Sequence, residues 1–225
     1  MTYACRSAWA IALWLLLVSL PLRAEPSHPT WDEAFPTAAA PTEVYFRADY
    51  LDGFGKPHRL QVWRDADRRL RRRTDELIDL YVERSGDGDY GYRLVVHARK
   101  TIIRADRAML YRIGIFSDWR SLAYVLDPPR GTYGLARDPS EAASTSAESC
   151  DWFRLEAGSP SRVSRVCWSR RWGVPLAIDA MTSEGAWTRR FTVEHIRVFR
   201  ADARIFAPPD GLVQVDEKPG DEQID

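Results

Sequence analysis

The chain has 225 residues, of which 45% are hydrophobic and 12% aromatic, a composition typical of a globular protein with a substantial core. Its 32 basic and 32 acidic residues give a formal net charge of zero at pH 7. A neutral chain is not drawn to polyanions by its overall charge, so we expect no nucleic-acid partner.

Residues 1–24 have the pattern of a secretory signal peptide. Arg6 provides the positive start, residues 9–20 are almost continuously apolar, and Ala24 is the small residue after which cleavage is simplest. The apolar run is short for a membrane-spanning helix, which needs roughly 20 residues. We therefore expect a periplasmic protein, cleaved near Ala24, with no transmembrane span in the mature chain. An uncleaved anchor is the alternative.

The rest of the chain divides into an arm, one domain and a tail. Residues 25–42 are rich in Pro and Ala and predict a flexible N-terminal arm. Residues 43–215 carry the alternating patterns of a folded domain, and the acidic residues 216–225 predict a mobile tail.

Alternation of apolar and polar residues predicts antiparallel strands through most of the domain. The early runs form a meander, and the last two form a long hairpin around the turn at residues 183–185. In the last strand the apolar phase changes at Glu194-His195, which indicates a β-bulge. The predicted strands cover residues 43–50, 58–64, 77–83, 90–98, 132–136, 151–156, 162–168, 174–181 and 187–200.

One short helix interrupts the strands. Residues 117–126 carry apolar side chains at helical spacing, and the prolines at positions 128 and 129 end the pattern. A single apolar helix between strands is expected to cover one face of the sheet.

Two cysteines remain after the predicted leader is removed. Cys150 and Cys167 lie at the edges of the strands 151–156 and 162–168, so antiparallel pairing brings them together. In an oxidising compartment we expect them to form a disulfide, and two free thiols are the alternative. They predict no zinc site, because no histidine lies at ligand spacing.

The C-terminal third resembles the LolA/LolB-type periplasmic lipoprotein carriers, a superfamily that includes the RseB sensor domain. The motifs that carry the resemblance are Gly173-Val174-Pro175-Leu176, the strand end Arg197-Val198-Phe199 and the segment Phe206-Ala207-Pro208-Pro209-Asp210-Gly211. The resemblance implies a mainly β fold, in which a curved antiparallel sheet forms an incomplete, half-open β-barrel with a short helix covering its concave face.

The resemblance also implies a function. It predicts a binding or carrier protein of the lipoprotein-sorting type, which holds a lipid acyl chain or a lipoprotein in a hydrophobic groove. The alternative is a non-enzymatic envelope sensor or scaffold that binds a protein partner. The apolar residues predicted to line the groove, for which a dry core is the alternative, are Phe46, Leu60, Ile78, Leu80, Val82, Leu94, Val96, Trp119, Leu122, Leu126, Ile178 and Phe191.

A run of arginines is the strongest local charge feature. These side chains could bind a phosphate or an anionic lipid headgroup, because the guanidinium group pairs with such anions through two parallel hydrogen bonds. Acidic residues flank the run, however, which favours a solvated strand face. The run contains Arg68, Arg69, Arg71, Arg72 and Arg73.

No catalytic motif is found in the sequence. It contains no Gly-x-Ser-x-Gly elbow, no phosphate-binding loop and no His-Glu-x-x-His helix. His58, His97 and His195 are scattered through strands, where structural roles are favoured. We therefore predict a protein that is not an enzyme and has no catalytic residue, no metal and no cofactor.

Overall fold

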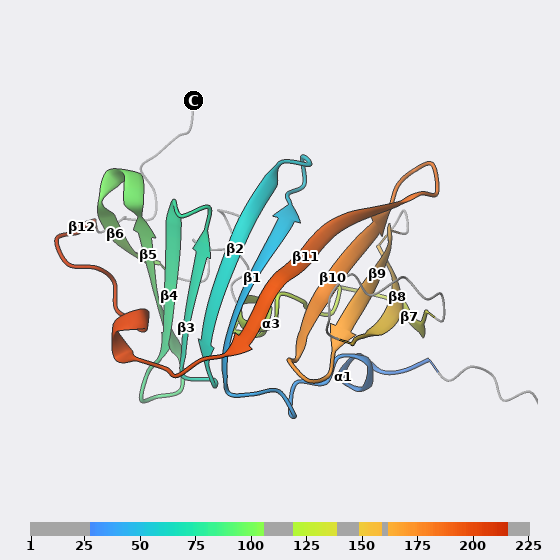
Figure 1. Ribbon diagram of the computed structural model, residues 1–225, viewed down its shortest axis with the longest axis horizontal. Helices are drawn as coiled ribbons and strands as arrows, with labels where there is room; N and C mark the ends of the chain where they lie inside the picture. Colours follow the sequence, from blue (N-terminus) through green and yellow to red (C-terminus); the bar gives the residue numbers. More distant parts are fainter. Residues whose placement is uncertain (1–27, 106–118, 139–148, 159–161, 216–225) are drawn as a thin grey trace, which may run out of the picture.

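The computed structural model describes residues 28–105, 119–138, 149–158 and 162–215. The predicted signal peptide and the predicted acidic tail lie outside these residues. Within them, twelve strands form one sheet in the order β12-β6-β5-β4-β3-β2-β1-β11-β10-β9-β8-β7 (Figure 1).

The first half of the sheet is the predicted meander, in which each strand pairs antiparallel with the next. Alternating burial along these strands gives each one an apolar face and a polar face. Its strands are β1 (Glu43–Leu51), β2 (Pro57–Asp65), β3 (Arg69–Thr74), β4 (Ile78–Arg84), β5 (Tyr90–Val96) and β6 (Thr101–Ala105).

The second half is a further antiparallel run that joins the first through the pairing of β11 with β1. A short last strand then lies parallel to β6. The strands of this half are β7 (Tyr133–Arg137), β8 (Asp151–Ala157), β9 (Arg162–Ser169), β10 (Val174–Met181), β11 (Trp187–Val198) and β12 (Val213–Val215).

This arrangement confirms the predicted fold class. The sheet is antiparallel except at β12, and its two edges, β12 and β7, do not pair with each other, so the barrel is incomplete. The predicted bulge is also present: Arg47 pairs with His195 and Ala48 pairs with Val193, which leaves Glu194 as the extra residue.

The helix α3 (Trp119–Tyr124) confirms the predicted interruption of the strands. Its buried Leu122 and Ala123 share one core cluster with Phe46, Val62 and Leu80 of the sheet. We call the sheet face that carries these three residues the inner face, and the opposite face of the same strands the outer face. In Figure 1, α3 lies behind the sheet, on the inner face.

The segment before β1 differs from the predicted loose arm. Residues Trp31–Ala34 form the one-turn helix α1, with a capping box between Thr30 and Glu33. Trp31 and Phe35 are buried, and the Phe35 ring meets the Trp168 ring edge to face at 5.3 Å between centroids. A single turn is too short to show helical periodicity in the sequence, and large aromatic rings rather than an apolar stripe hold it in place.

Gly173 explains why the strand β10 opens as it does. The residue has a φ of +63°, and a Cβ atom at this position would lie 2.8 Å from the Cβ of Ala40. Glycine is therefore required both by the backbone conformation and by the N-terminal segment that passes beside it.

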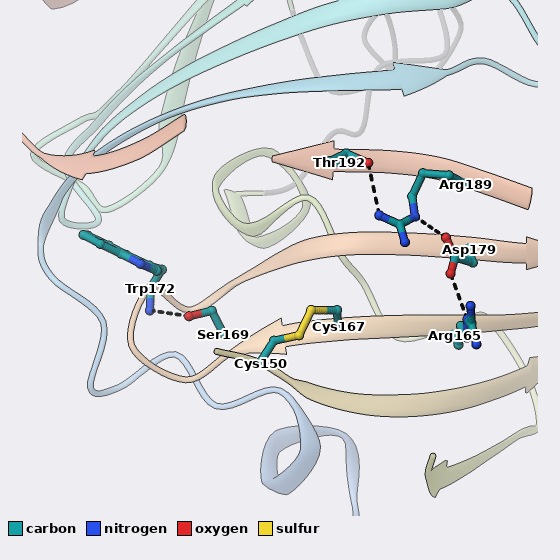
Figure 2. The surroundings of a disulfide bond; sticks show 8 residues. All are labelled: Cys150, Arg165, Cys167, Ser169, Trp172, Asp179, Arg189 and Thr192. Atoms are coloured by element: carbon teal, nitrogen blue, oxygen red, sulfur yellow. Dashed lines mark hydrogen bonds and ion pairs between the residues drawn. A yellow bond between two sulfur atoms is a disulfide. The ribbon is translucent and has the colours of Figure 1, made fainter. Parts of the chain in front are cut away.

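The predicted disulfide joins Cys150 and Cys167, whose Cα atoms are 5.4 Å apart (Figure 2). Antiparallel pairing of β8 with β9 brings the two cysteines together, as the sequence predicted. Asp179 lies on the neighbouring strand β10 and forms ion pairs with Arg165 and Arg189 (Figure 2). This half of the sheet is thus cross-linked by covalent and ionic contacts.

After β11 the chain crosses the outer face before it returns to the sheet edge as β12 (Figure 1). The crossing includes the 3₁₀ helix η2 (Ala203–Phe206), which contacts β3. The buried Phe206 lies under the guanidinium of Arg69, 4.8 Å from the ring centroid. A second 3₁₀ helix, η1 (His97–Arg99), joins β5 to β6.

Candidate functional site

The inner face of the first half of the sheet gathers most of the residues predicted to line a groove. Seven of the twelve belong to the core cluster that contains α3, four are partly buried against that cluster, and Leu126 packs against a second cluster around α1. The seven are Phe46, Leu60, Leu80, Val82, Leu94, Leu122 and Phe191, and the four are Ile78, Val96, Trp119 and Ile178. The structure thus brings them together, as both a groove and a dry core require.

One charged residue interrupts this apolar surface. The strand register aligns six inner-face residues in a row across β1 to β6, and only one member of the row is polar. The row runs Phe46, Val62, Arg72, Leu80, Leu94 and Ile103, and its five apolar members are all buried. Arg72 therefore places a guanidinium in the middle of the apolar inner face.

Arg72 has no counter-ion among the described residues. Its Nη1 atom is buried and makes no hydrogen bond, and no carboxylate of the described residues contributes to its electrostatic environment. Desolvation lowers the pKa of Arg72, and the hydroxyl side chain of Tyr50 is the neighbour that raises it in opposition. An arginine keeps its charge in proteins, so this site holds an incompletely compensated cation.

Arg64, the other arginine of the inner face, is in a different situation. Its side chain is 2% exposed, and its guanidinium donates to the carbonyl oxygens of Ala123, Pro41 and Trp172 at 3.2, 3.3 and 3.4 Å. The guanidinium also lies 4.5 Å from the ring centroid of Tyr124. Arg64 thus ties β2 to α3 and to two loops, and its donors are used within the protein.

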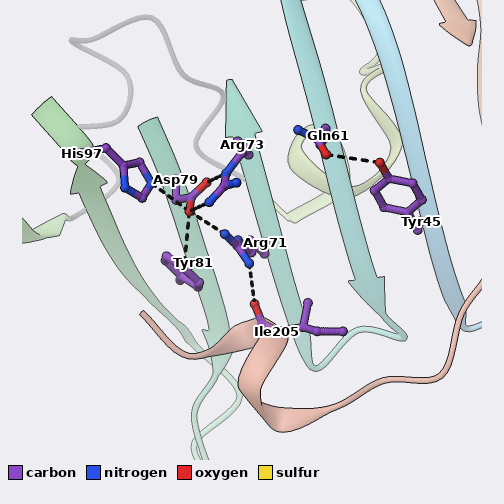
Figure 3. Close-up of polar contacts among 8 residues, drawn as sticks. All are labelled: Tyr45, Gln61, Arg71, Arg73, Asp79, Tyr81, His97 and Ile205. Carbon is purple, nitrogen blue, oxygen red and sulfur yellow. Dashed lines mark hydrogen bonds and ion pairs between the residues drawn. The ribbon is translucent and has the colours of Figure 1, made fainter. Parts of the chain in front are cut away.

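The outer face carries a second charged cluster, centred on Asp79 of β4 (Figure 3). The Asp79 carboxylate is 0% exposed and accepts hydrogen bonds from Arg71 Nη2 at 2.8 Å and from Arg73 Nε at 2.7 Å. The Tyr81 hydroxyl and His97 Nε2 each lie 3.1 Å from the same carboxylate. Two arginines of β3, one tyrosine of β4 and one histidine of η1 therefore contact the same carboxylate.

Electrostatics in this cluster keep Asp79 charged and Tyr81 neutral. Burial raises the pKa of Asp79, but hydrogen bonds and charges from Arg73 and Arg71 outweigh it and hold the pKa at about 2. Burial and the Asp79 charge raise the pKa of Tyr81 to about 12. Neither Asp79 nor Tyr81 exchanges a proton near neutral pH, so the ion pairs between β3 and β4 persist there.

The arginines of the run have different partners according to the face of β3 on which they lie. Arg68 and Arg69 pair with Asp65, and Arg71 and Arg73 pair with Asp79, so four of the five point to acids of the outer face or the β2–β3 turn. These pairs differ from the predicted solvated face, because Asp65 and Asp79 are buried. Arg72 is the member on the inner face.

A row of aromatic and cationic side chains extends across the outer face. Register aligns Arg197, Tyr45, Trp63, Arg71 and Tyr81 on successive strands. The Tyr45 and Trp63 rings lie 5.1 Å apart, and the Arg197 and Arg71 guanidinium groups lie 5.0 and 4.9 Å from the Tyr45 and Trp63 ring centroids. Tyr45 also donates a hydrogen bond to Gln61 (Figure 3).

His58 lies at the rim of the inner face and forms a second histidine–carboxylate contact. Its Nδ1 lies 2.6 Å from Asp75 and its Nε2 lies 3.3 Å from Asp52, while its ring stacks on Tyr50 at 5.3 Å. The hydrogen bond to Asp75 is the largest of the contributions that raise the pKa of His58. No group of three potential metal ligands is found within the part of the chain that the structure describes.

Sequence reasoning placed the arginine run on a strand but missed the separation of Arg72 from its neighbours. The signal was present, because Arg72 has the same parity as Leu70 in its strand. Arg64 shares the parity of Leu60 and Val62 in the same way. The parity of a strand position therefore indicates which arginines of a run face the apolar side of a sheet.

Among the described residues no helix is long and apolar enough to cross a bilayer. The chain matches no protein-family model, and no curated protein sequence is similar to it. The resemblance to lipoprotein carriers therefore rests on the motifs of the C-terminal third and remains a prediction.

Proposed function

We propose that this protein is a non-enzymatic periplasmic binding protein that holds the acyl chain of a lipid, or of a lipid-modified protein, against the inner face of β1 to β6. The observation that supports this proposal is the extent of the apolar inner face in a sheet that does not close. The side chains of an open, curved sheet do not fill its interior by themselves. The helix α3 completes the burial of the central residues, and the partly buried apolar residues at the border of the cluster are where a ligand would add to it.

The energetics of an acyl ligand are favourable on such a surface. Each buried methylene contributes about 0.8 kcal/mol, so a chain of moderate length binds usefully even where part of it stays exposed. Partly buried apolar side chains stand at the border of the cluster, where a chain would enter. They include Ile78, Val96 and Trp119, and the Trp119 ring stacks on Tyr90 at 5.0 Å.

The predicted export signal is consistent with a carrier role. A protein that shields acyl chains in the aqueous periplasm lowers the free-energy cost of moving them between membranes, because contact between an acyl chain and water is unfavourable. Carriage of lipoproteins toward the outer membrane is the specific form of this function that the family resemblance implies.

The first test is native mass spectrometry of the mature protein purified from the periplasm, followed by organic extraction and lipid analysis. Trp119→Glu is expected to abolish the lipid adduct, because it places a charge at the border of the apolar cluster. Leu77→Glu is the matched control, since Leu77 is 57% exposed and outside that cluster. Absence of bound lipid in the wild-type protein, with no uptake of added myristic acid or monomyristoylglycerol, would contradict the proposal.

A second candidate function is supported by the outer-face row. Tyr, Trp and Arg are the residues most enriched at the energetic centres of protein interfaces, and Tyr45, Trp63 and Arg197 are at least partly exposed here. This row favours the scaffold alternative, in which an envelope protein binds the outer face. Photo-crosslinking from position 45 in intact cells distinguishes the two functions. A single specific protein adduct that Trp63→Ala removes would favour the scaffold, and its absence would exclude binding at this row.

A further inference from the structure

We propose that the inner face selects an acyl ligand with an anionic head group, a carboxylate or a phosphate, and that Arg72 binds that head group. This inference rests on the proposed function and makes it specific, because it identifies the chemical class of the ligand. Of the two interpretations of the arginine run, the inference keeps anion binding for Arg72 alone, while the other four arginines form ion pairs with Asp65 or Asp79.

The first argument is the position of the charge. Arg72 stands between Val62 and Leu80 in a row that is otherwise apolar, on a face that packs against a helix. A methionine or leucine would fill the same place without removing a charge from water. Desolvation of a charge without a counter-ion costs several kcal/mol in order of magnitude. The neutral hydroxyl of Tyr50 compensates this cost only in part, and an anion of another molecule would compensate it better.

The second argument is the state of its donors. The Nη1 atom is buried without a hydrogen-bond acceptor, which is uncommon for a polar atom in a protein interior. A guanidinium presents paired N–H groups that match the two oxygens of a carboxylate or phosphate. The Tyr50 hydroxyl lies beside the guanidinium and can donate to the same anion.

The third argument is the absence of an internal competitor in the described residues. Asp79 is on the opposite face of the neighbouring strand and is saturated by Arg71, Arg73, Tyr81 and His97. The acids nearest to Tyr50 along the inner rim, Asp52 and Asp75, are held by His58. A ligand anion therefore meets a cation that these carboxylates do not neutralise.

The experiment compares two ligands with the same chain and different head groups. Lipid-free protein is titrated at pH 7.5, below the critical micelle concentrations, with myristic acid and with monomyristoylglycerol, and binding is measured by calorimetry. We expect myristate to bind about 10- to 100-fold more tightly, the range of a charge-assisted hydrogen-bonded pair. Arg72→Met is expected to remove this preference by weakening myristate binding while leaving monomyristoylglycerol binding unchanged.

Matched variants isolate the role of Arg72. Arg104→Met makes the same charge change on the exposed outer side of β6 and is expected to keep the preference. Tyr50→Phe keeps the ring, removes the hydroxyl and is expected to weaken myristate binding several-fold. This variant tests the site even where Arg72→Met impairs folding, because it alters one atom of the same site.

Two further ligands distinguish the source of the anion. Lysophosphatidic acid with a myristoyl chain tests a lipid phosphate, and inorganic phosphate tests a free anion without a chain. Tight binding of the first and no binding of the second is the result expected for a head-group site, whereas saturable binding of phosphate alone would overturn it.

The remaining outcomes separate the two proposals. Equal affinity for myristate and monomyristoylglycerol, unchanged in Arg72→Met, would overturn the head-group inference and leave the acyl-binding function intact. A folded protein that binds neither ligand would overturn the proposed function together with this inference.

Discussion

Arginines lie on the two opposite faces of the strand β3, and their surroundings differ. On the outer face, Arg71 and Arg73 converge on the buried carboxylate of Asp79, so each of these three groups has an ion-pair partner, although Arg71 Nε itself makes no hydrogen bond. On the inner face, Arg72 stands between Val62 and Leu80 in the strand register, and its Nη1 atom has no acceptor. The paired arginines around Asp79 contribute to a stable fold. An arginine without a counter-ion, such as Arg72, would not be selected for stability alone.

The difference teaches how to separate structural charges from functional ones. A buried ion whose hydrogen bonds are all made by neighbouring side chains, such as Asp79, is not available to bind a ligand. Arg72 is partly buried and has no counter-ion among the described residues, and local departures of this kind from the rules of a stable fold concentrate at binding sites. Mutations at the two faces should therefore move stability in opposite directions.

The largest effect is expected from Asp79→Asn. The substitution removes the buried charge that neutralises Arg71 and Arg73, and breaking such a network by removing one partner costs about 3–5 kcal/mol. Urea-induced unfolding followed by tryptophan fluorescence measures the loss. Asp202→Asn is the matched control, because Asp202 also pairs with an arginine but on the solvent-exposed surface. Equal stability of the two variants would show that the Asp79 cluster is not structural.

The pH dependence of the unfolding free energy should reveal the contribution of Asp79 in acid. The pKa of Asp79 is lowered from 3.8 to about 2, so the stabilisation it provides is present above pH 3.8 and is lost as the pH falls through 2. The shift corresponds to about 2 kcal/mol. The difference in unfolding free energy between the wild-type protein and Asp79→Asn should therefore shrink over this interval. A constant difference from pH 5 to pH 2 would contradict the assignment.

Arg72→Met is expected to act in the other direction. Without ligand, replacing the incompletely compensated cation by an apolar side chain of similar length should raise the unfolding free energy by about 1 kcal/mol. Arg71→Met is the neighbouring control and should lower the unfolding free energy, since it removes a partner of Asp79. Both variants are compared by their urea midpoints. Destabilisation by Arg72→Met would indicate that Arg72 is paired in the folded protein.

The smallest effect on stability is expected at His58, which lies at the rim of the inner face. Hydrogen bonds to Asp75 and Asp52 raise the pKa of His58 above 6.5 against the effect of burial. The resulting stabilisation is complete below pH 6.5 and is lost as the pH rises through the pKa of the folded state. NMR titration of the imidazole measures that pKa directly, and His58→Gln should flatten the stability profile over the same pH range. A pKa at or below 6.5 would contradict the contact with Asp75.

Much of the fold could be predicted from local patterns. Alternation located the long strands, the phase change located the bulge opposite Arg47, and strand pairing located the disulfide. The elements that were missed are short and depend on distant partners. Thr101–Ala105 does not alternate in hydrophobicity, Val213–Val215 has three residues, and α1 is a single turn. Tertiary contacts, which no local pattern shows, decide such elements.

The candidate site was predictable only in part, for a similar reason. Apolar parity identified the residues that gather on the inner face, such as Phe46 and Leu80. The pairing of Arg73 with Asp79, and of Arg72 with Leu80, depends on the register between β3 and β4. Two arginines of one run therefore acquire different roles through an alignment that the sequence does not specify by itself.

The return of the chain across the outer face has a consequence for assembly. By lying along β6, β12 occupies backbone groups that an open sheet would otherwise present to a second molecule. A protein that carries a large apolar face at high concentration is exposed to strand addition and aggregation at such an edge. β12 then forms the edge itself, and its three residues offer less backbone for strand addition than the five residues of β6 would.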